Sequence, residues 1–358
     1  ENGVKFLCKA HGIDMFSAEA TFISSNKLQL TDGVEIDFKK AVIATGSEPT
    51  ELKGFEFSDR VLDYKKALML DFIPKCMTII GAGYVAVEIG TLYAKLGSEV
   101  HIIARSDVLS HFDTEAVALV KKSMEALGIK VHTGVSPSSY DDKSITLSDG
   151  TKIESDVIVC AIGLSPYTKG LGLENTKIAL NTRGFIEVDG TLRTADESIY
   201  AVGDVIGEPM LAHKAMRQGV VAGEAASGQN SGYDNIVVPA VIFSDPEIAI
   251  AGTIEGEGIT VTKFPLSALG RAIALDSTKG FVKIAYDSDR LVKGVEIVSD
   301  DANAMISEAA LAIEMGASVE DIADTIHPHP TYSEGIQEAA EAAMGRPIHF
   351  YYGDNKQQ

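Results

Sequence analysis

The sequence contains little cysteine, with only Cys8, Cys76 and Cys160 among its 358 residues. No two of them form a Cys-x-x-Cys pair, and their spacing is not typical of metal ligands, so no metal site is predicted. Cys160 falls in an apolar run and is expected to be an inert core residue. No partner is apparent for Cys8 or Cys76. So few cysteines, unpaired in pattern, fit a reducing compartment.

Positive charge is also scarce. The 31 Lys and Arg residues face 51 Asp and Glu residues, which gives a net charge of −20 and a pI near 4.8. This balance argues against nonspecific binding to nucleic acid and against docking on anionic membranes, and it suits a cytoplasmic enzyme. No apolar run is long enough to span a bilayer, and no signal peptide is apparent. The opening residues lack an initiator Met and are typical of mid-helix, so we expect a fragment of a longer chain.

What the sequence does contain is typical of a globular protein of two or three domains, with 45% hydrophobic and 23% charged residues.

The most informative stretch of the sequence runs from Met77 to Arg105. The pattern predicts a strand, a glycine turn, a helix and a second strand, which is the first unit of a dinucleotide-binding fold. Gly81 permits the tight turn, Gly83 lets the backbone approach a pyrophosphate, and Ala86 keeps helix and strand close. The N–H groups at the helix start then hold the phosphates. The alternative is a packing turn without a ligand.

The second strand of this unit ends at Arg105, where an acidic residue would indicate NAD. The missing acid and the presence of Arg105 together favour NADP, whose 2′-phosphate an arginine can bind. The alternative is a solvated surface arginine.

The flanking segments are predicted as follows. Alternating strands around Ala20–Leu30 and Val34–Lys40 meet at an Asp32-Gly33 turn, and 51–75 is a linker. After the central unit come a helix at Thr114–Leu127, a strand at Ile129–His132, a hairpin at Tyr140–Ile153 and a strand at Asp156–Ile162 that ends at Gly163.

Two further strands end in small or acidic residues that could contact a ligand. The first, Ala41–Ala44, ends at Thr45 and Gly46, and the second, Ile199–Val202, ends at Gly203 and Asp204. Carboxyl ends of strands are where α/β sheets receive ligands, although Thr45-Gly46 fits a plain loop exit and Asp204 an ordinary turn. The helix predicted at 210–226 would point its N-terminus at the same crevice.

From Val237 onward the sequence is typical of a separate α+β domain. Its expected strands and helices are Val238–Phe243, Ile259–Phe264, Phe281–Asp287, Leu291–Val298, and then about 302–315 and 333–344.

Between the last two helices lies His327-Pro-His329-Pro-Thr331-Tyr-Ser-Glu334. Alternate prolines hold this backbone extended, and two imidazoles in a rigid loop suggest acid–base chemistry. Glu334 could orient one ring. Thr331-x-x-Glu334 is also a helix capping box, which the residues alone favour over a catalytic role. A His-x-His metal site is a third option, but no acidic or thiol ligand accompanies it at a useful spacing.

Six motifs together carry a family resemblance: ATGSEP (44–49), GAGYVAVE (81–88), IYAVGD (199–204), MLAHKA (210–215), FPLSALGRA (264–272) and HPHPTYSE (327–334). In this order the chain resembles the flavin-dependent disulfide reductases, also called pyridine nucleotide-disulfide oxidoreductases. It is most similar to their dihydrolipoamide dehydrogenase branch, whereas GAGYVAVE and Ala104-Arg105 are more similar to the NADP-using glutathione reductase branch.

The resemblance implies an α/β fold with two Rossmann-like dinucleotide-binding domains, the first incomplete, and a C-terminal α+β dimerisation domain. The FAD-binding domain would comprise 1–50 and 166–235, the NAD(P)-binding domain 51–165, and the dimerisation domain 236–358. The implied cofactors are FAD and either NAD or NADP. The implied partners are a second copy of the chain and the lipoyl domain of a 2-oxoacid dehydrogenase complex.

The resemblance also assigns roles. His329 would be the base that takes a thiol proton from dihydrolipoamide, and Glu334 would orient it, both serving the other subunit. Tyr84 would cover the flavin, and Glu88 would lie by the nicotinamide. The remaining residues expected at the cofactors are Thr45, Gly46, Gly81, Gly83, Ala86, Arg105, Gly163, Asp204, Leu211, Ala212 and His213.

One departure from the family stands out. The FAD-binding GxGxxG and the redox Cys-x4-Cys of the family's first segment are absent from these residues. We expect that these residues are part of a longer chain that contains this segment. The enzyme would then move electrons between dihydrolipoamide and NAD(P). The alternatives are an NADPH-dependent disulfide reductase and a non-catalytic nucleotide-binding or assembly subunit.

Overall fold

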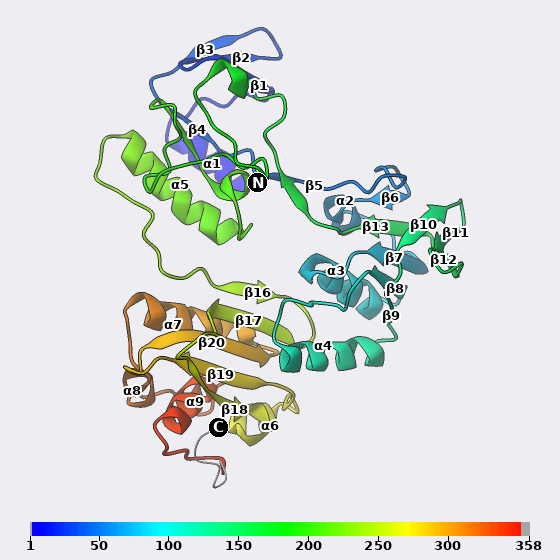
Figure 1. Cartoon of the computed structure of the whole chain (residues 1–358), viewed down its shortest axis with the longest axis vertical. Coiled ribbons are helices and arrows are strands. Elements are labelled where there is room, and N and C mark those ends of the chain that lie inside the picture. Colours follow the sequence, from blue (N-terminus) through cyan, green and yellow to red (C-terminus); the bar gives the residue numbers. More distant parts are fainter. Residues whose placement is uncertain (1, 352–358) are drawn as a thin grey trace. The chain divides into compact units, whose positions relative to one another are not determined.

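The structure is a computed structural model that describes residues 2–351 (Figure 1). The chain forms two compact units. Unit 1 comprises Glu1–Glu48 and Ser165–Asp234, and unit 2 comprises Pro49–Leu164 and Asn235–Gln358. The chain crosses from one unit to the other at β5 (Ser47–Pro49) and β14 (Leu164–Pro166), which pair as a two-stranded sheet.

Unit 1 is built around the parallel pair β4 (Ala41–Ile43) and β15 (Ile199–Ala201). Its core includes Ile43, Ile199 and Val205, and the helix α5 (Ala212–Ala226) follows. One expectation is wrong here, because the single strand predicted at Ala20–Leu30 is two strands joined by a turn. The remaining elements are α1 (Asn2–Ala10), β1 (Ala20–Ser24), β2 (Lys27–Leu30), β3 (Glu35–Asp37), and the short 3₁₀ turns Leu173–Asn175 and Gly203–Ile206.

The first part of unit 2 is a five-stranded parallel sheet in the order β6-β13-β7-β8-β9. One face packs on the helices α3 (Tyr84–Lys95) and α4 (Thr114–Ala126) through residues such as Met77, Ile79 and Ile102. The strands are β6 (Val61–Leu62), β7 (Cys76–Ile80), β8 (Glu99–Ala104), β9 (Lys130–Thr133) and β13 (Val157–Cys160). The expected strand, turn, helix and strand between Met77 and Arg105 are therefore present.

One expectation for this region is wrong. The 51–75 segment is more than a linker, because β6 pairs with β13 and the Asp63 side chain caps the helix α2 (Tyr64–Leu68). A two-residue strand is too short to show a periodicity, which explains the error. The hairpin predicted at Tyr140–Ile153 is present as β11 (Ser144–Leu147) and β12 (Lys152–Glu154), and the strand β10 (Pro137–Tyr140), which was not predicted, adds to it.

The second part of unit 2 is an antiparallel sheet in the order β16-β17-β20-β19-β18. The sequence analysis missed β17 (Glu247–Gly252), which pairs with β16 and β20, and the short helices α6 (Gly270–Ala274) and α8 (Val319–Ala323). The other elements are β16 (Ala240–Ile242), β18 (Thr260–Pro265), β19 (Phe281–Tyr286), β20 (Val292–Ser299), α7 (Ala302–Glu314) and α9 (Glu334–Ala343).

The two parts of unit 2 share one hydrophobic core. Ile242, Ile248, Phe281 and Val298 of the antiparallel part belong to the same buried cluster as Met77 and its neighbours. Lys283 Nζ also lies 2.9 Å from Oδ1 of Asp113, the residue that caps α4. Within the part of the chain that the structure describes, no helix combines the length and the apolar character that a transmembrane span requires.

Candidate functional site

Two glycines with different constraints shape the turn between β7 and α3. Gly81 has φ +118°, and a Cβ there would lie 2.2 Å from the carbonyl oxygen of Ala161, so only glycine fits. A Cβ on Gly83 would meet no protein atom within 4 Å. Gly83 is the N-cap of α3 and has no side-chain cap, and the N–H groups of Val85 and Ala86 have no intrahelical acceptor. The turn is therefore open to an anion at the helix start.

Close packing of α3 on the sheet depends on two small residues. Ala86 is fully buried, as the sequence analysis expects for a residue that holds helix and strand together. Gly90, which the sequence analysis did not single out, lies one turn later. A Cβ there would lie 3.2 Å from Cδ1 of Ile102.

Glu88 lies on α3 and is half-buried. Its Oε1 accepts a hydrogen bond from the backbone N–H of Phe243 at 3.0 Å. Burial raises the pKa of the Glu88 carboxyl, and the hydrogen bond opposes this only in part. Tyr84, the first residue of α3, is 38% exposed, which leaves much of its ring at the surface of the turn.

Arg105 and Gly163 follow the carboxyl ends of β8 and β13. Arg105 is exposed, and its side chain makes no hydrogen bond or ion pair with any other residue between 2 and 351. Its guanidinium is therefore available to an anionic ligand, although the same would hold for a solvated surface arginine. Gly163 has φ +134°, and its carbonyl oxygen accepts a hydrogen bond from the N–H of Thr50 at 3.0 Å.

In unit 1, Asp204 lies in the 3₁₀ turn that follows β15. Its Oδ2 accepts a hydrogen bond from the Ser47 hydroxyl at 2.7 Å. Lys214, missed by the sequence analysis, is 5% exposed and donates from Nζ to the Gly207 carbonyl at 2.6 Å. Burial lowers the pKa of Lys214, and the negative charge of Asp204 opposes that shift. Asp204 thus holds a hydrogen bond to Ser47 and lies in the electrostatic environment of Lys214.

Thr45 and Gly46 are both linked to Tyr167. The Thr45 hydroxyl donates to the Tyr167 carbonyl at 2.7 Å, and the Tyr167 N–H donates to the Gly46 carbonyl at 3.0 Å. Gly46 has φ +71°. These bonds fix the path of the chain after β4.

The helix α5 begins close to Asp204 in the sequence. Leu211 is its N-cap, with extended backbone and no side-chain cap, and no acidic residue occupies the first turn. Ala212 and His213 are exposed. The positive end of this helix is therefore not neutralised by an acidic side chain of its own first turn.

The two histidines of the His-Pro-His-Pro stretch have opposite environments. The His327 side chain is 4% exposed, and its ring lies between the Thr325 carbonyl (2.9 Å) and Glu308 Oε1 (2.7 Å). The hydrogen bond with Glu308 raises the pKa of His327. The His329 side chain is 75% exposed, and its Nδ1 lies 2.9 Å from Glu334 Oε1. His327 is thus structural, whereas His329 presents an oriented ring at the surface.

Glu334 accepts two hydrogen bonds at once. Oε1 contacts His329, and Oε2 accepts from the Thr331 N–H at 2.7 Å. The predicted capping box is only half formed, because the Thr331 hydroxyl donates to the Pro328 carbonyl and Ser333 is the N-cap of α9. The same carboxylate therefore contacts both the backbone at the start of α9 and the imidazole of His329, so the two predicted roles are compatible.

One group of at least three potential metal ligands occurs in the described part of the chain, and it lies away from the His-Pro-His-Pro stretch. It consists of Cys76, Glu99 and His101. Cys76 therefore has polar neighbours that the sequence analysis did not find, because they come from another strand.

Comparison with known proteins decides the family. The model of the pyridine nucleotide-disulphide oxidoreductases matches residues 1–219, and the model of their dimerisation domain matches residues 238–340. The chain belongs to the pyridine nucleotide-disulphide oxidoreductase family. The expected α/β fold with a C-terminal dimerisation domain is confirmed. The dimerisation domain indicates a homodimer, and the family typically uses FAD and NAD(P).

Several dihydrolipoyl dehydrogenases are similar in sequence. The protein from Geobacillus stearothermophilus is 41% identical over 365 residues, which cover 97% of this chain and 78% of that protein. Dihydrolipoyl dehydrogenase 2 from Haloarcula marismortui is 38% identical, with the same coverage. The chain is therefore a flavoprotein disulfide oxidoreductase related to dihydrolipoyl dehydrogenase.

Two solved structures are similar in fold. LpdA from Mycobacterium tuberculosis superimposes with a TM-score of 0.89 at 28% identity and covers 96% of this chain and 80% of its own. The HOCl-induced flavoprotein disulfide reductase RclA from Escherichia coli has a TM-score of 0.85 at 25% identity and covers 94% and 83%.

Proposed function

We propose that the protein oxidises dihydrolipoamide and passes the electrons through FAD to NAD(P)⁺, with His329 as the general base. The observation that carries this proposal is the pairing of an exposed imidazole with a held carboxylate. Relatives about 40% identical that are named dihydrolipoyl dehydrogenases support the same substrate.

The hydrogen bonds of the pair support a direction of proton transfer. With Nδ1–H donated to Glu334, the lone pair of Nε2 points away from the carboxylate and can accept a proton from a substrate thiol. Glu334 then stabilises the imidazolium, and the Thr331 N–H prevents that carboxylate from turning away. In the homodimer we expect this pair to serve the disulfide of the other subunit.

The residues around the two cofactor sites fit the groups that the family uses. Gly81, Gly83 and the start of α3 would hold the pyrophosphate of the pyridine nucleotide, with Glu88 near its nicotinamide. Asp204 and the start of α5 would contact the flavin. When bound, these cofactors would accept the electron pair that the dithiol gives to a redox disulfide of the family's first segment. The chain itself positions both groups and moves the thiol proton.

A second function is favoured by Arg105. An exposed guanidinium with no described partner, and no acid at the end of β8, supports NADP over NAD and hence an NADPH-dependent disulfide reductase. The acid–base pair would then protonate the leaving thiolate instead of deprotonating a thiol. Steady-state rates with dihydrolipoamide and NAD(P)⁺, compared with those for NADPH and glutathione disulfide, distinguish the two directions.

The general-base role is tested with His329→Gln in the purified holoenzyme. We expect dihydrolipoamide oxidation to fall about 10²–10⁴-fold, because the thiol loses its proton acceptor. Oxidation of NADH or NADPH by ferricyanide should stay within about twofold, since that reaction needs no thiol proton transfer.

His349→Gln is the matched control. His349 is also an exposed histidine on a carboxylate, with its Nδ1 2.5 Å from Glu338 Oε1. Its replacement should leave both reactions unchanged. If His329→Gln oxidises dihydrolipoamide at the wild-type rate, His329 is not the base.

A further inference from the structure

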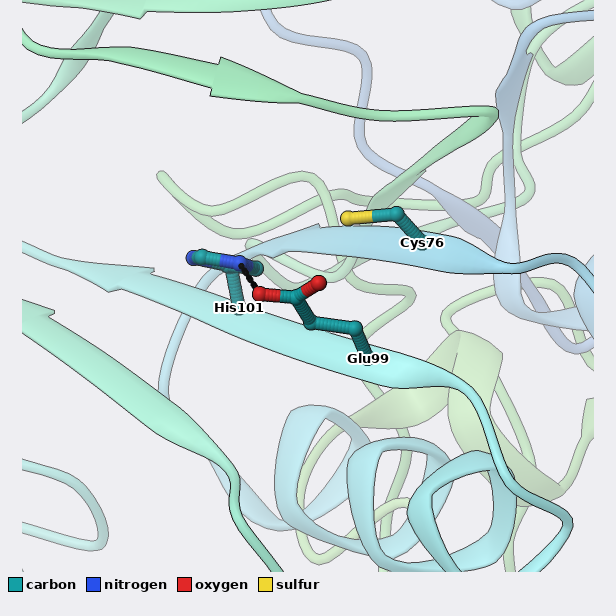
Figure 2. Close-up of side chains that lie close together, drawn as sticks. All are labelled: Cys76, Glu99 and His101. Atoms are coloured by element: carbon teal, nitrogen blue, oxygen red, sulfur yellow. Dashed lines mark hydrogen bonds and ion pairs between the residues drawn. The ribbon is translucent and has the colours of Figure 1, made fainter.

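Three side chains of different chemistry gather at the amino ends of two neighbouring parallel strands. Cys76 begins β7, and Glu99 begins β8 and lies opposite Cys76 in the register. His101 lies two residues further along β8, on the same face of the sheet as Glu99. Figure 2 shows the thiol, the carboxylate and the imidazole turned toward a common space. The glycine turn follows the other end of β7, about 16 Å away for a five-residue strand.

The three donor atoms are close enough to bind one cation. The Cys76 sulfur, a Glu99 carboxylate oxygen and a His101 ring nitrogen all lie within 4.8 Å of one another. Glu99 Oε1 lies 3.2 Å from Nε2 of His101. Ligand atoms around a tetrahedral Zn²⁺ are roughly 3–4 Å apart. Side-chain rotations that move the donor atoms by about 1 Å would therefore bring all three within bonding distance of one ion.

The imidazole of His101 is already oriented for this role. Its Nδ1 lies 2.9 Å from Nε2 of His132 on β9, and the two rings stack with centroids 5.2 Å apart. In the tautomer that donates from Nδ1 to His132, Nε2 keeps its lone pair toward Glu99 and Cys76. Ligating histidines commonly donate their other ring N–H to a fixed acceptor in this way. Burial lowers the pKa of both histidines.

The charges around the thiol favour a cation. Burial and the carboxylates of Glu99, Asp156 and Glu154 raise the pKa of Cys76 to about 11. In the present structure the thiol donates to the Glu154 carbonyl at 2.7 Å. A metal ion replaces that proton and neutralises the negative surroundings. The opposing group is Lys130, which forms an ion pair with Glu99 and competes with a metal for Oε1.

An unpartnered hydroxyl lies on the same face of the sheet. Thr78 is fully buried, lies two residues after Cys76 and is paired in register with His101. Its Oγ1 has no hydrogen-bond partner among the described residues. A water in the fourth coordination position of the metal would be a suitable partner for a hydroxyl on this face.

We propose that Cys76, Glu99 and His101 form a Zn²⁺ site at the amino ends of β7 and β8, with His132 orienting the imidazole. A thiolate, an imidazole and a carboxylate are a typical zinc donor set, whereas Mg²⁺ and Ca²⁺ select oxygen ligands. The metal would link β7 to β8 at the end of the sheet opposite to the glycine turn. The site is independent of the dithiol chemistry proposed above.

The test is calorimetric titration of the reduced, metal-free holoenzyme with ZnCl₂ near pH 7, with metal content after dialysis as a second measurement. We expect one Zn²⁺ per chain to depend on Cys76, because one such donor group lies among residues 2–351. Because a zinc-bound cysteine is a thiolate and an ordinary cysteine thiol is protonated at about pH 7, titrations in buffers of different ionisation enthalpy should show about one proton released.

Three variants define the ligands. Cys76→Ser should weaken Zn²⁺ binding at least about tenfold and abolish the proton release, and His132→Ala should weaken it about 10–100-fold as an orienting residue. Lys130→Met should tighten binding, because it removes the competing ammonium group. Cys8→Ser is the control and should bind as the wild type does. Zinc should raise the melting temperature of the wild type but not of Cys76→Ser.

Two outcomes would overturn the proposal. The first is no saturable uptake of Zn²⁺ by the reduced holoenzyme. The second is the same affinity and proton release in Cys76→Ser as in the wild type, which would place any bound zinc elsewhere.

Discussion

Oε1 of Glu88 accepts a hydrogen bond from the backbone N–H of Phe243 at 3.0 Å. Glu88 lies on the helix that starts at the glycine turn, and Phe243 directly follows the first strand of the antiparallel sheet. The shared hydrophobic core and this polar contact both join the two parts of unit 2. The residue expected beside the nicotinamide is therefore also a structural contact between the two parts.

Glu88→Ala should lower the free energy of unfolding by about 0.5–1.5 kcal/mol, because the Phe243 N–H loses its acceptor. Glu88→Gln keeps an amide oxygen and should cost less. Urea unfolding measures both. Glu257→Ala, an exposed glutamate in the same unit, is the control and should change the unfolding free energy little. Equal stability of Glu88→Ala and the wild type would contradict the structural role.

Alanine substitutions of the two glycines in the turn should have different effects, one on stability and the other on nucleotide binding. Gly81→Ala forces a Cβ to 2.2 Å from the Ala161 carbonyl at φ +118°, so we expect a loss of several kcal/mol of stability. Gly83→Ala meets no protein atom and should keep the stability within about 0.5 kcal/mol. It should nevertheless weaken nucleotide binding, because the new methyl group occupies the approach to the turn. Unfolding curves and NAD(P)H titrations separate the two effects, and normal nucleotide binding by a folded Gly83→Ala would refute the assignment of the turn.

Arg105→Ala tests the preference for NADP. We expect KM for NADPH to rise at least about tenfold, since a guanidinium–phosphate pair contributes more than 1 kcal/mol, while KM for NADH stays within about twofold. Lys122→Ala removes another exposed cation of the same sheet domain and is the control. Unchanged NADPH kinetics in Arg105→Ala would mean that Arg105 is a solvated surface residue.

Glu296 should make stability depend on pH. Its side chain is 0% exposed, and both carboxylate oxygens lack hydrogen bonds to described residues. Lys283 Nζ lies 3.9 Å from the carboxylate. Burial and the neighbouring Asp113 raise its pKa from 4.5 to about 7. The folded state therefore holds a proton that the unfolded state has lost between these values, so stability falls as pH rises from about 4.5 to 7.

Glu296→Gln removes that titration. At pH 8 the variant should be more stable than the wild type by up to about 3 kcal/mol, and at pH 4 the two should be alike. Chemical unfolding at a series of pH values measures the difference. Glu257→Gln should follow the wild-type curve throughout. The same pH dependence in Glu296→Gln as in the wild type would show that Glu296 is ionised in the folded state above pH 5.

Local patterns were sufficient for the parts of the fold and site that involve residues close in sequence. The strand, glycine turn and helix around Gly81 were predictable because apolar spacing and turn chemistry are local properties. The contact between His329 and Glu334 was predictable for the same reason, since they are only five positions apart. The strand β17 was missed because its alternating Ile and Ala residues are a weak signal, and its pairing on both sides supplies the rest.

Features that depend on distant partners could not be predicted. His327 resembled His329 in sequence, and its burial depends on Glu308, which lies 19 residues earlier on α7. The neighbours of Cys76 depend on the register of β7 with β8, which the sequence alone does not specify. Glu296 carries no local sign of burial, because Asp113 comes from another part of unit 2.

The hydrogen bond between the Thr50 N–H and the Gly163 carbonyl brings together the two ends of a long segment of the chain. The parallel-sheet domain is thus an insertion whose entry and exit are adjacent, as in proteins that accept guest domains without strain in the host. A very short peptide could join the two ends if the domain were removed, because closing a short loop between adjacent ends costs little conformational entropy. Exchange of this domain for that of a relative with a different nucleotide preference would therefore require the two junctions to be kept and, within unit 2, the contacts with the antiparallel sheet to be matched.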